Sequence, residues 1–378
     1  MGVLTSQPGK GIWTLGAVVV TAARLPLWML WYVPSSLRQH KDWTYRQALL
    51  VQMVKTFLWH ASVVEMKTPL SLLPDAEKEK WAVATVAPSA AYTGPARLDG
   101  TIQPEACGGT WYPTPNPRGG AYQPQFVILH FHGGAYVIGD GRKKDAAFAA
   151  ATLRNHTDAT HVFCPQYRLS SNPGCRFPAA LQDAITAYSY LINERNIDAS
   201  NIILSGDSAG ANLALALTRY IAEHGKSTGL ATPHAALLWS MWVSPLGALD
   251  TETANKSPNR GMDYVPVTFG AWGARSYCPL PSTGADLDHP YINFSNHAFA
   301  TNVPIYISTG ECEMPFHDDV ALYEEMRAIE GNDVHLQIEE HAVHDIILTG
   351  PLVGFEKEAV VAAKRAGEWL RTLKPSTR

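Results

Sequence analysis

Short runs of strand-forming residues alternate with helical segments along most of this chain, and this alternation limits the possible folds more than any other feature. The first run, FVILHF at 126–131, is continuous and apolar, as expected of a strand buried on both faces of a sheet. Further runs of this kind occupy 161–164, 202–205, 236–243, 303–308 and 334–338. The alternation predicts βαβ units and therefore an α/β fold with a mostly parallel, doubly wound sheet.

The other segments are expected to surround this sheet. Helical patterns open the chain, a Gly- and Pro-rich stretch follows them, and a later irregular stretch interrupts the alternation. We therefore divide the chain into N-terminal cap helices with leading edge strands (1–120), a first part of the core (121–245), a second cap segment (246–300) and a C-terminal part of the core (301–378). Hydrophobic residues make up 46% of the chain, which is enough apolar material for one large core.

The N-terminal segment 11–33 is strongly apolar and raises the question of a membrane anchor. Arg24 and Pro26 divide it into two pieces, each shorter than the roughly 20 apolar residues of a spanning helix. The first piece resembles the apolar part of a signal peptide, but only Lys10 precedes it. The segment therefore favours cap helices, with peripheral membrane contact as the next alternative.

The charge and the cysteines exclude several classes of function. A net charge of -4 without a long basic run argues against nucleic-acid binding. The five cysteines are an odd number and lack CxxC or Cys/His metal spacing, so they predict free thiols and neither a disulfide framework nor a zinc site.

A G-x-S-x-G sequence, Gly206 to Gly210, lies between a predicted strand (IILS) and a predicted helix (ANLALALTRY). Glycines at these positions allow a strained turn from strand to helix, which would expose the hydroxyl of Ser208 at the carboxyl end of the sheet. The motif alone is weak, but its context makes Ser208 a candidate nucleophile.

The sequence His132-Gly133-Gly134-Ala135-Tyr136 follows the first predicted strand. Backbone N–H groups beside small side chains can approach a substrate oxygen, so Gly133, Gly134 and Ala135 are candidates to border an oxyanion hole. The N–H of Ala209, directly after Ser208, would complete it.

Two histidines follow the last predicted strand, VHLQI, in the sequence EEHAVHDI. A histidine on a loop beyond that strand could serve Ser208 as its base. Spacing alone does not separate His341 from His344.

Three long motifs, HGGAYVIGD, YRLSSNPGCRFPAALQDAITAYSYL and GDSAGANLALAL, resemble the hormone-sensitive-lipase-like branch of the α/β-hydrolases. The resemblance covers roughly 120–350, and the N-terminal segment and the HDIIL ending are similar to fungal members. It implies the α/β-hydrolase fold, with a mostly parallel central sheet flanked by helices and a helical cap.

The resemblance also selects residues. The family's PxHGF ending falls on AVHDI and selects His344 as the catalytic base. Glu313, in GECE, occupies the place of the family's aspartate, and Ala135 replaces the third glycine of the family's HGGG motif. Glu311, Asp318 and Asp319 are the rival acids. The resemblance implies no cofactor or metal.

The expected activity is that of a serine carboxylesterase-type hydrolase, which cleaves an apolar or natural-product-like ester through an acyl-enzyme. The alternatives are acyl transfer, cyclisation or dehydration in a fungal biosynthetic pathway, and a ligand-binding homologue without catalysis, as the plant gibberellin receptor is similar to this family. The expected partner is a small-molecule ester; peripheral membrane contact and a homodimer stay open. A cytoplasmic or endoplasmic-reticulum-membrane-associated location is favoured, and secretion stays open.

Overall fold

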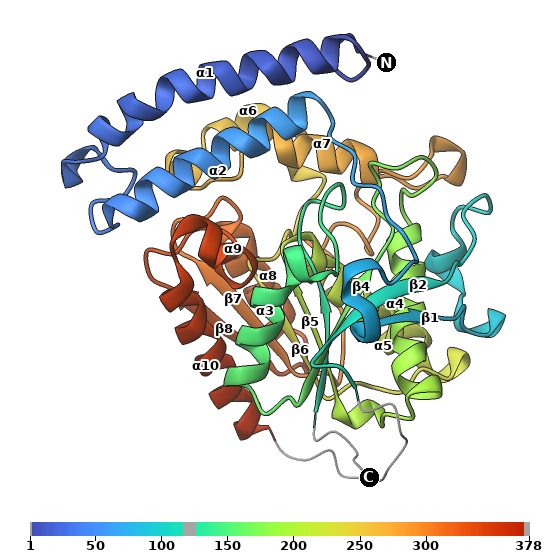
Figure 1. The fold of residues 1–378 in the computed structure, drawn as a ribbon. Coiled ribbons are helices and arrows are strands. Elements are labelled where there is room, and N and C mark those ends of the chain that lie inside the picture. The colour runs from blue at the N-terminus through green and yellow to red at the C-terminus, as the bar shows by residue number, and fades with distance from the viewer. Residues whose placement is uncertain (1, 116–125, 374–378) are drawn as a thin grey trace.

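The centre of the protein is an eight-stranded sheet (Figure 1), seen in a computed structural model that describes residues 2–115 and 126–373. Its strand order is β1-β2-β4-β3-β5-β6-β7-β8. β1 and β2 are antiparallel to their neighbours and the other pairs are parallel, which confirms the predicted mostly parallel sheet. The predicted boundary between residues 120 and 121 lies outside the described residues. The strands are β1 (Trp81–Ala84), β2 (Cys107–Tyr112), β3 (Val127–Phe131), β4 (His161–Gln166), β5 (Ile202–Asp207), β6 (Ala235–Trp239), β7 (Ile305–Gly310) and β8 (Val334–Glu339).

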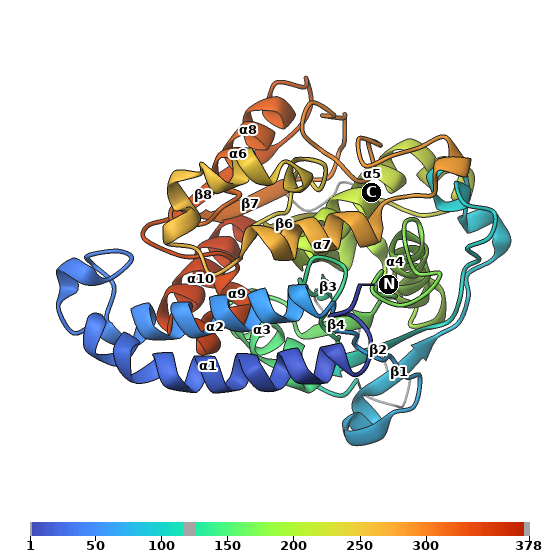
Figure 2. The same ribbon diagram turned by 90° about the horizontal axis from the view of Figure 1, so that it is seen from above.

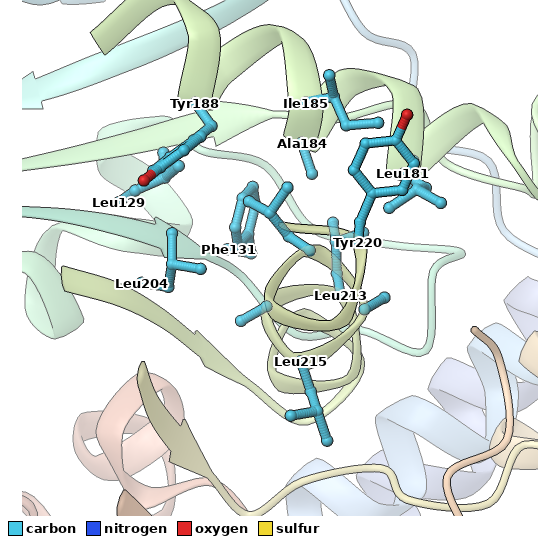
Figure 3. Packing of buried hydrophobic residues seen from close by; sticks show 14 of the residues in the cluster. Leu129, Phe131, Leu181, Ala184, Ile185, Tyr188, Leu204, Leu213, Leu215 and Tyr220 are labelled. Carbon is cyan, nitrogen blue, oxygen red and sulfur yellow. The ribbon is translucent and has the colours of Figure 1, made fainter. Parts of the chain in front are cut away.

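Helices cover both faces of the sheet. The helices α4 (Ala179–Ser189), α5 (Ala209–Thr228) and α8 (Phe316–Arg327) pack on one face, and α3 (Lys143–His156), α9 (Ile346–Val353) and α10 (Glu356–Thr372) lie on the other. Figure 3 shows the first layer, where Phe131 and Leu204 of the sheet meet Ala184 of α4 and Leu213 of α5. Because both faces are covered, all residues of the central strands β3, β5, β6 and β7 are buried.

The predicted strand at 236–243 is too long. β6 ends at Trp239, because the next residue, Ser240, has a φ of 45° and turns the chain out of the sheet. This turn places Trp242 beside Ser208, whose carbonyl oxygen accepts the Trp242 N–H at 3.1 Å. The end of the strand therefore helps to form the edge of the sheet at which the candidate site lies.

The apolar N-terminal segment forms one helix and not two pieces. Helix α1 (Gly9–Trp31) runs through Pro26 without a break, and it is long and apolar enough to cross a membrane. It lies along α2 (Tyr45–Val63) on the outside of the molecule (Figures 1 and 2), with Trp13 packed against Trp59 of α2. The opposite face of α1 is exposed to solvent: Ile12 is 71% exposed and Leu30 is 73% exposed.

The second cap segment meets the first through α2. Residues 246–300 contain the short helix α6 (Thr251–Asn255) and the helix α7 (Val267–Tyr277), which packs against α2. Lys55 of α2 donates hydrogen bonds to the carbonyl oxygens of Arg260 and Asp263, and Ser62 of α2 bonds the hydroxyl of Thr268. These bonds fix α2 above the carboxyl end of the sheet (Figure 1).

Candidate active site

Ser208 lies at the sharp turn between β5 and α5. Its backbone has φ 52° and ψ -117°, a conformation that serine adopts only where the surrounding chain enforces it. The flanking glycines are required for this turn, because a Cβ on Gly206 would collide with the carbonyl oxygen of Gly210, and one on Gly210 would collide with that of Phe131. The predicted strand-to-helix turn is therefore present, and Ser208 lines the pocket above it.

His344 and Glu313 approach Ser208 from two further loops. His344 Nε2 lies 2.9 Å from Ser208 Oγ, and His344 Nδ1 lies 2.8 Å from Glu313 Oε2. Glu313 is fully buried, and its other oxygen accepts the Gly310 N–H at 2.7 Å and the Thr309 hydroxyl at 2.5 Å. Burial alone would lower the pKa of His344, but the hydrogen bond and charge of Glu313 outweigh it and raise that pKa above 6.5. This arrangement allows an imidazole to take the serine proton.

The rival residues lie elsewhere. His341 points to the surface, where its Nδ1 is 3.2 Å from Glu311 Oε2. Asp318 and Asp319 lie in the first turn of α8. The Asp319 carboxyl is buried near Glu313, and burial together with the charge of Glu313 raises the pKa of Asp319. Among these carboxylates, Glu313 alone is hydrogen-bonded to His344 in the described residues.

The loop after β3 carries three of the predicted oxyanion-hole residues. Gly133 differs from the others because its N–H is already hydrogen-bonded within the protein. Its N–H donates to Asp207 Oδ2 at 2.5 Å, so it is not available to a substrate. Within the described residues, the N–H groups of Gly134, Ala135 and Ala209 make no such bond; that of Ala209 is the first of α5, where helical N–H groups lack partners. Three of the four predicted residues thus keep an N–H that could bind an oxyanion.

A cavity of about 1320 Å³ opens above Ser208 and His344. Its walls come from both cap segments and from the sheet edge, and they are mostly apolar. Met53, Val54 and Phe57 of α2 form one side. No described residue of α1 lines the cavity, so α2 is the N-terminal helix that covers the site. A site with these walls suits an apolar small molecule.

A family profile described as the alpha/beta hydrolase fold matches residues 128–348, which is more than half of the chain. The chain belongs to this family. The match spans the sequence from β3 to α9 and therefore includes Ser208, Glu313 and His344.

Relatives of this α/β-hydrolase include an acetyl-hydrolase from Streptomyces hygroscopicus, 27% identical over 67% of the chain and 77% of the relative. An ethyl acetate hydrolase from Pseudomonas putida is 25% identical over 64% of the chain and 72% of the relative. A solved hormone-sensitive lipase from a metagenome library matches with a TM-score of 0.53 and 25% identity, over 71% of the chain and 82% of its own. These matches support the hormone-sensitive-lipase-like branch, and similarity to fungal members stays a prediction.

The α/β-hydrolase holds a buried pair of carboxyl groups behind its site, for which the sequence contains no motif. Asp345, directly after His344, is buried beside Asp207, and burial and the charge of Asp207 raise the pKa of Asp345 well above its usual value. The two carboxyl groups are hydrogen-bonded to each other. Asp207 in turn lies 3.0 Å from His130 Nε2 and holds the N–H of Gly133, so the pair ties three segments of the site together.

A further buried carboxyl, that of Asp263, comes from the second cap segment and was also missed. Its side chain accepts the N–H of Met314 at 2.6 Å and that of Val265 at 3.2 Å. Burial raises the pKa of Asp263, although the nearby His344 opposes this effect. Asp263 thus fixes the residue that follows Glu313. A carboxylate within the irregular stretch 246–300 was the only signal in the sequence that could have identified it.

Proposed function

We propose that this protein is a serine carboxylesterase that cleaves an apolar small-molecule ester through an acyl-enzyme. The observation that carries the proposal is the continuous hydrogen-bonded line from Ser208 Oγ through His344 to Glu313. Relatives named as an acetyl-hydrolase, an ethyl acetate hydrolase and a carboxylesterase from Mycobacterium tuberculosis support ester hydrolysis.

In the first half of the reaction, His344 Nε2 takes the proton of Ser208 as Oγ attacks the ester carbonyl carbon. The negative oxygen of the tetrahedral intermediate accepts hydrogen bonds from N–H groups of Gly134, Ala135 and Ala209. His344 then gives its proton to the leaving alcohol, and the acyl group stays on Ser208.

In the second half, a water molecule loses a proton to His344 and attacks the acyl carbon, which releases the acid and restores Ser208. Glu313 holds the Nδ1–H of His344 throughout and stabilises the imidazolium. The proposal needs no cofactor.

The contact between Ala135, in the loop after β3, and the cap supports a preference for where the larger substituent of the ester lies. Gly273 of α7 faces it so closely that a Cβ on Gly273 would lie 2.5 Å from Ala135 O. The cap therefore closes tightly on this side of the site, and the volume for a large substituent lies toward α2, where Phe57 lines the cavity. We expect the longer apolar part of the ester to extend toward α2.

An ester panel tests the proposed function. We expect kcat/KM for p-nitrophenyl esters to rise from acetate to octanoate, because each methylene buried in the cavity contributes about 0.8 kcal/mol. A fluorophosphonate should label the protein on one serine, identified as Ser208 by peptide mass spectrometry. If folded protein hydrolyses no ester and takes no label, the proposal fails and a ligand-binding homologue becomes the better account.

Acyl transfer, cyclisation or dehydration in the same pocket is the alternative to ester hydrolysis. These reactions would suit the predicted role in a fungal biosynthetic pathway. Labelling of Ser208 together with very slow hydrolysis, and faster turnover when an alcohol is added as acceptor, would favour acyl transfer.

Peripheral membrane contact through α1 is a second part of the proposal. Ile12, Leu15, Val19, Leu27 and Leu30 form an exposed stripe at helical spacing. The sequence has no acidic residue before Asp42 but several basic ones, which favours anionic lipid. Tyr45 of α2 donates to the carbonyl oxygen of Met29, and Trp13 packs on α2 near the other end, so α1 would lie along a membrane surface.

Vesicle flotation tests this contact. The full chain should float with phosphatidylserine-containing vesicles. Replacing Leu15 and Leu30 together by glutamate should weaken binding at least about tenfold, because it removes two leucines that would be buried in the membrane and adds negative charge. Val361→Glu, at an exposed apolar position of α10, is the matched control and should float like the wild type. Equal flotation of the double variant would contradict the proposal.

A further inference from the structure

A second group of titratable side chains lies at the surface, outside the pocket, where the connection between α1 and α2 meets the loop after β8. The connection supplies His40 and Asp42, and the loop supplies His341. Asp42 Oδ2 is 3.9 Å from His40 Nδ1 and 3.8 Å from His341 Nε2. One nitrogen or oxygen atom from each residue lies within 4.8 Å of those of the other two.

This spacing is close to that of a metal coordination sphere. Ligand atoms in a tetrahedral Zn²⁺ site lie about 2.0–2.1 Å from the metal and therefore roughly 3.4 Å from one another. Each of the two distances to Asp42 would have to shorten by only about 0.5 Å, which a rotation of partly exposed side chains provides. Two imidazoles and one carboxylate are also ligands that Zn²⁺ prefers.

The ring of His341 is oriented for this role by Glu311. The Oε2 atom of Glu311 lies 3.2 Å from His341 Nδ1 and also accepts the backbone N–H of His341 at 3.1 Å. In the tautomer with its proton on Nδ1, toward Glu311, the lone pair of Nε2, the atom closest to Asp42, is available to a metal. Metal-binding histidines are commonly held by carboxylates in this way.

The ring of His40 is placed by its own turn and by Trp43. The backbone N–H of Asp42 points at His40 Nδ1 across 3.4 Å, a long hydrogen bond that a metal would replace. Trp43 is buried, and its Nε1–H donates to the carbonyl oxygen of His341 at 2.7 Å. The two imidazole rings consequently lie with their centres 4.6 Å apart.

We propose that His40, Asp42 and His341 bind a divalent cation of the zinc class, with a fourth position open to water and Glu311 orienting His341. The site takes no part in the ester chemistry and does not rest on the proposed function. Its effect is mechanical, because His341 is three residues before His344 and Glu311 is two residues before Glu313. A bound metal would join the α1–α2 connection to the two loops that hold the proposed base and acid.

Metal titration of the full chain, after treatment with a chelator, tests the site. Calorimetry with Zn²⁺ should give one site with a micromolar or lower Kd, and Co²⁺ should give visible absorption bands typical of a four-coordinate nitrogen and oxygen site. Zn²⁺ at about 100 times its Kd should raise Tm by about 3 °C or more. Asp42→Asn, at an exposed side chain, and His341→Ala should each weaken binding at least about tenfold.

Two control variants separate this site from other histidines. His297 lies 3.3 Å from Asp288 in an exposed pair of one histidine and one carboxylate, so His297→Ala should bind metal like the wild type. His344→Ala should also retain binding, because the cluster does not include the pocket histidine. The proposal is overturned if the wild type binds no Zn²⁺ at a Zn²⁺ concentration of about 100 micromolar, well above the expected Kd. It is equally overturned if binding is lost in His344→Ala and kept in Asp42→Asn.

Discussion

Replacing Ser208 by alanine should lower kcat by about 10⁶, since loss of the nucleophile alone removes about as much catalysis as loss of a whole Ser-His-acid triad. The residual rate would come from the N–H groups of the oxyanion hole and from substrate binding. KM should change little, because the pocket walls do not depend on Oγ. Kinetics with p-nitrophenyl butyrate, together with loss of fluorophosphonate labelling, measure the effect.

A serine at the other end of the same helix provides the matched control. Ser227 is exposed near the end of α5 and donates to the carbonyl oxygen of His224. Ser227→Ala should keep wild-type kinetics and labelling. Activity in Ser208→Ala above about a hundredth of the wild-type rate, in protein with an unchanged melting curve, would mean that another residue is the nucleophile.

The central sheet was predictable because it is buried on both faces. Strands such as β3 and β5 are continuous apolar runs, and glycines and charged residues separate them from the helices. The end of β6 was not predictable, because the apolar sequence continues through Val243 while the φ of Ser240 turns the chain. Such a turn depends on the loop around His344, where Ser240 Oγ accepts the N–H of Asp345.

The N-terminal helix shows the limit of local rules. Arg24 and Pro26 predicted an interruption, yet α1 is continuous across both. Proline removes one backbone donor and crowds the preceding turn, which disfavours an isolated helix. Here α1 packs on α2 on both sides of Pro26, through Trp13 and through Met29, and these contacts hold the helix together. Tertiary packing of this kind leaves no signal within the segment itself.

The site residues were predictable where a local motif carries them. Ser208 stands in a strand-to-helix turn with its glycines, and the resemblance singled out His344 and Glu313. Asp263 and Asp345 were missed because their roles come from burial against distant segments. The surface cluster was missed for the same reason, since about 300 residues separate Asp42 from His341 and no spacing rule covers such a distance.

Glu313→Gln should lower kcat/KM by about 10⁴, the loss seen when the acid of a serine triad is made neutral. Glutamine keeps the shape of the side chain and could still bond the Gly310 N–H. However, it has no charge to stabilise the imidazolium of His344. Asp263 adds to the charge near His344, but its carboxyl accepts the N–H groups of Met314 and Val265, and among the described residues it has no hydrogen bond to His344.

The pH profile distinguishes this role from a purely structural one. The reaction needs neutral His344, so wild-type kcat/KM should rise as the pH passes the pKa of His344. Glu313 raises this pKa above the usual 6.5. In Glu313→Gln that pKa should fall, and the acid limb of the profile should move to lower pH. Glu340→Gln removes an exposed charge from the same loop as His344 and should change neither the rate nor the profile. If Glu313→Gln keeps most of its activity while Asp318→Asn loses it, Glu313 is not the acid of this site.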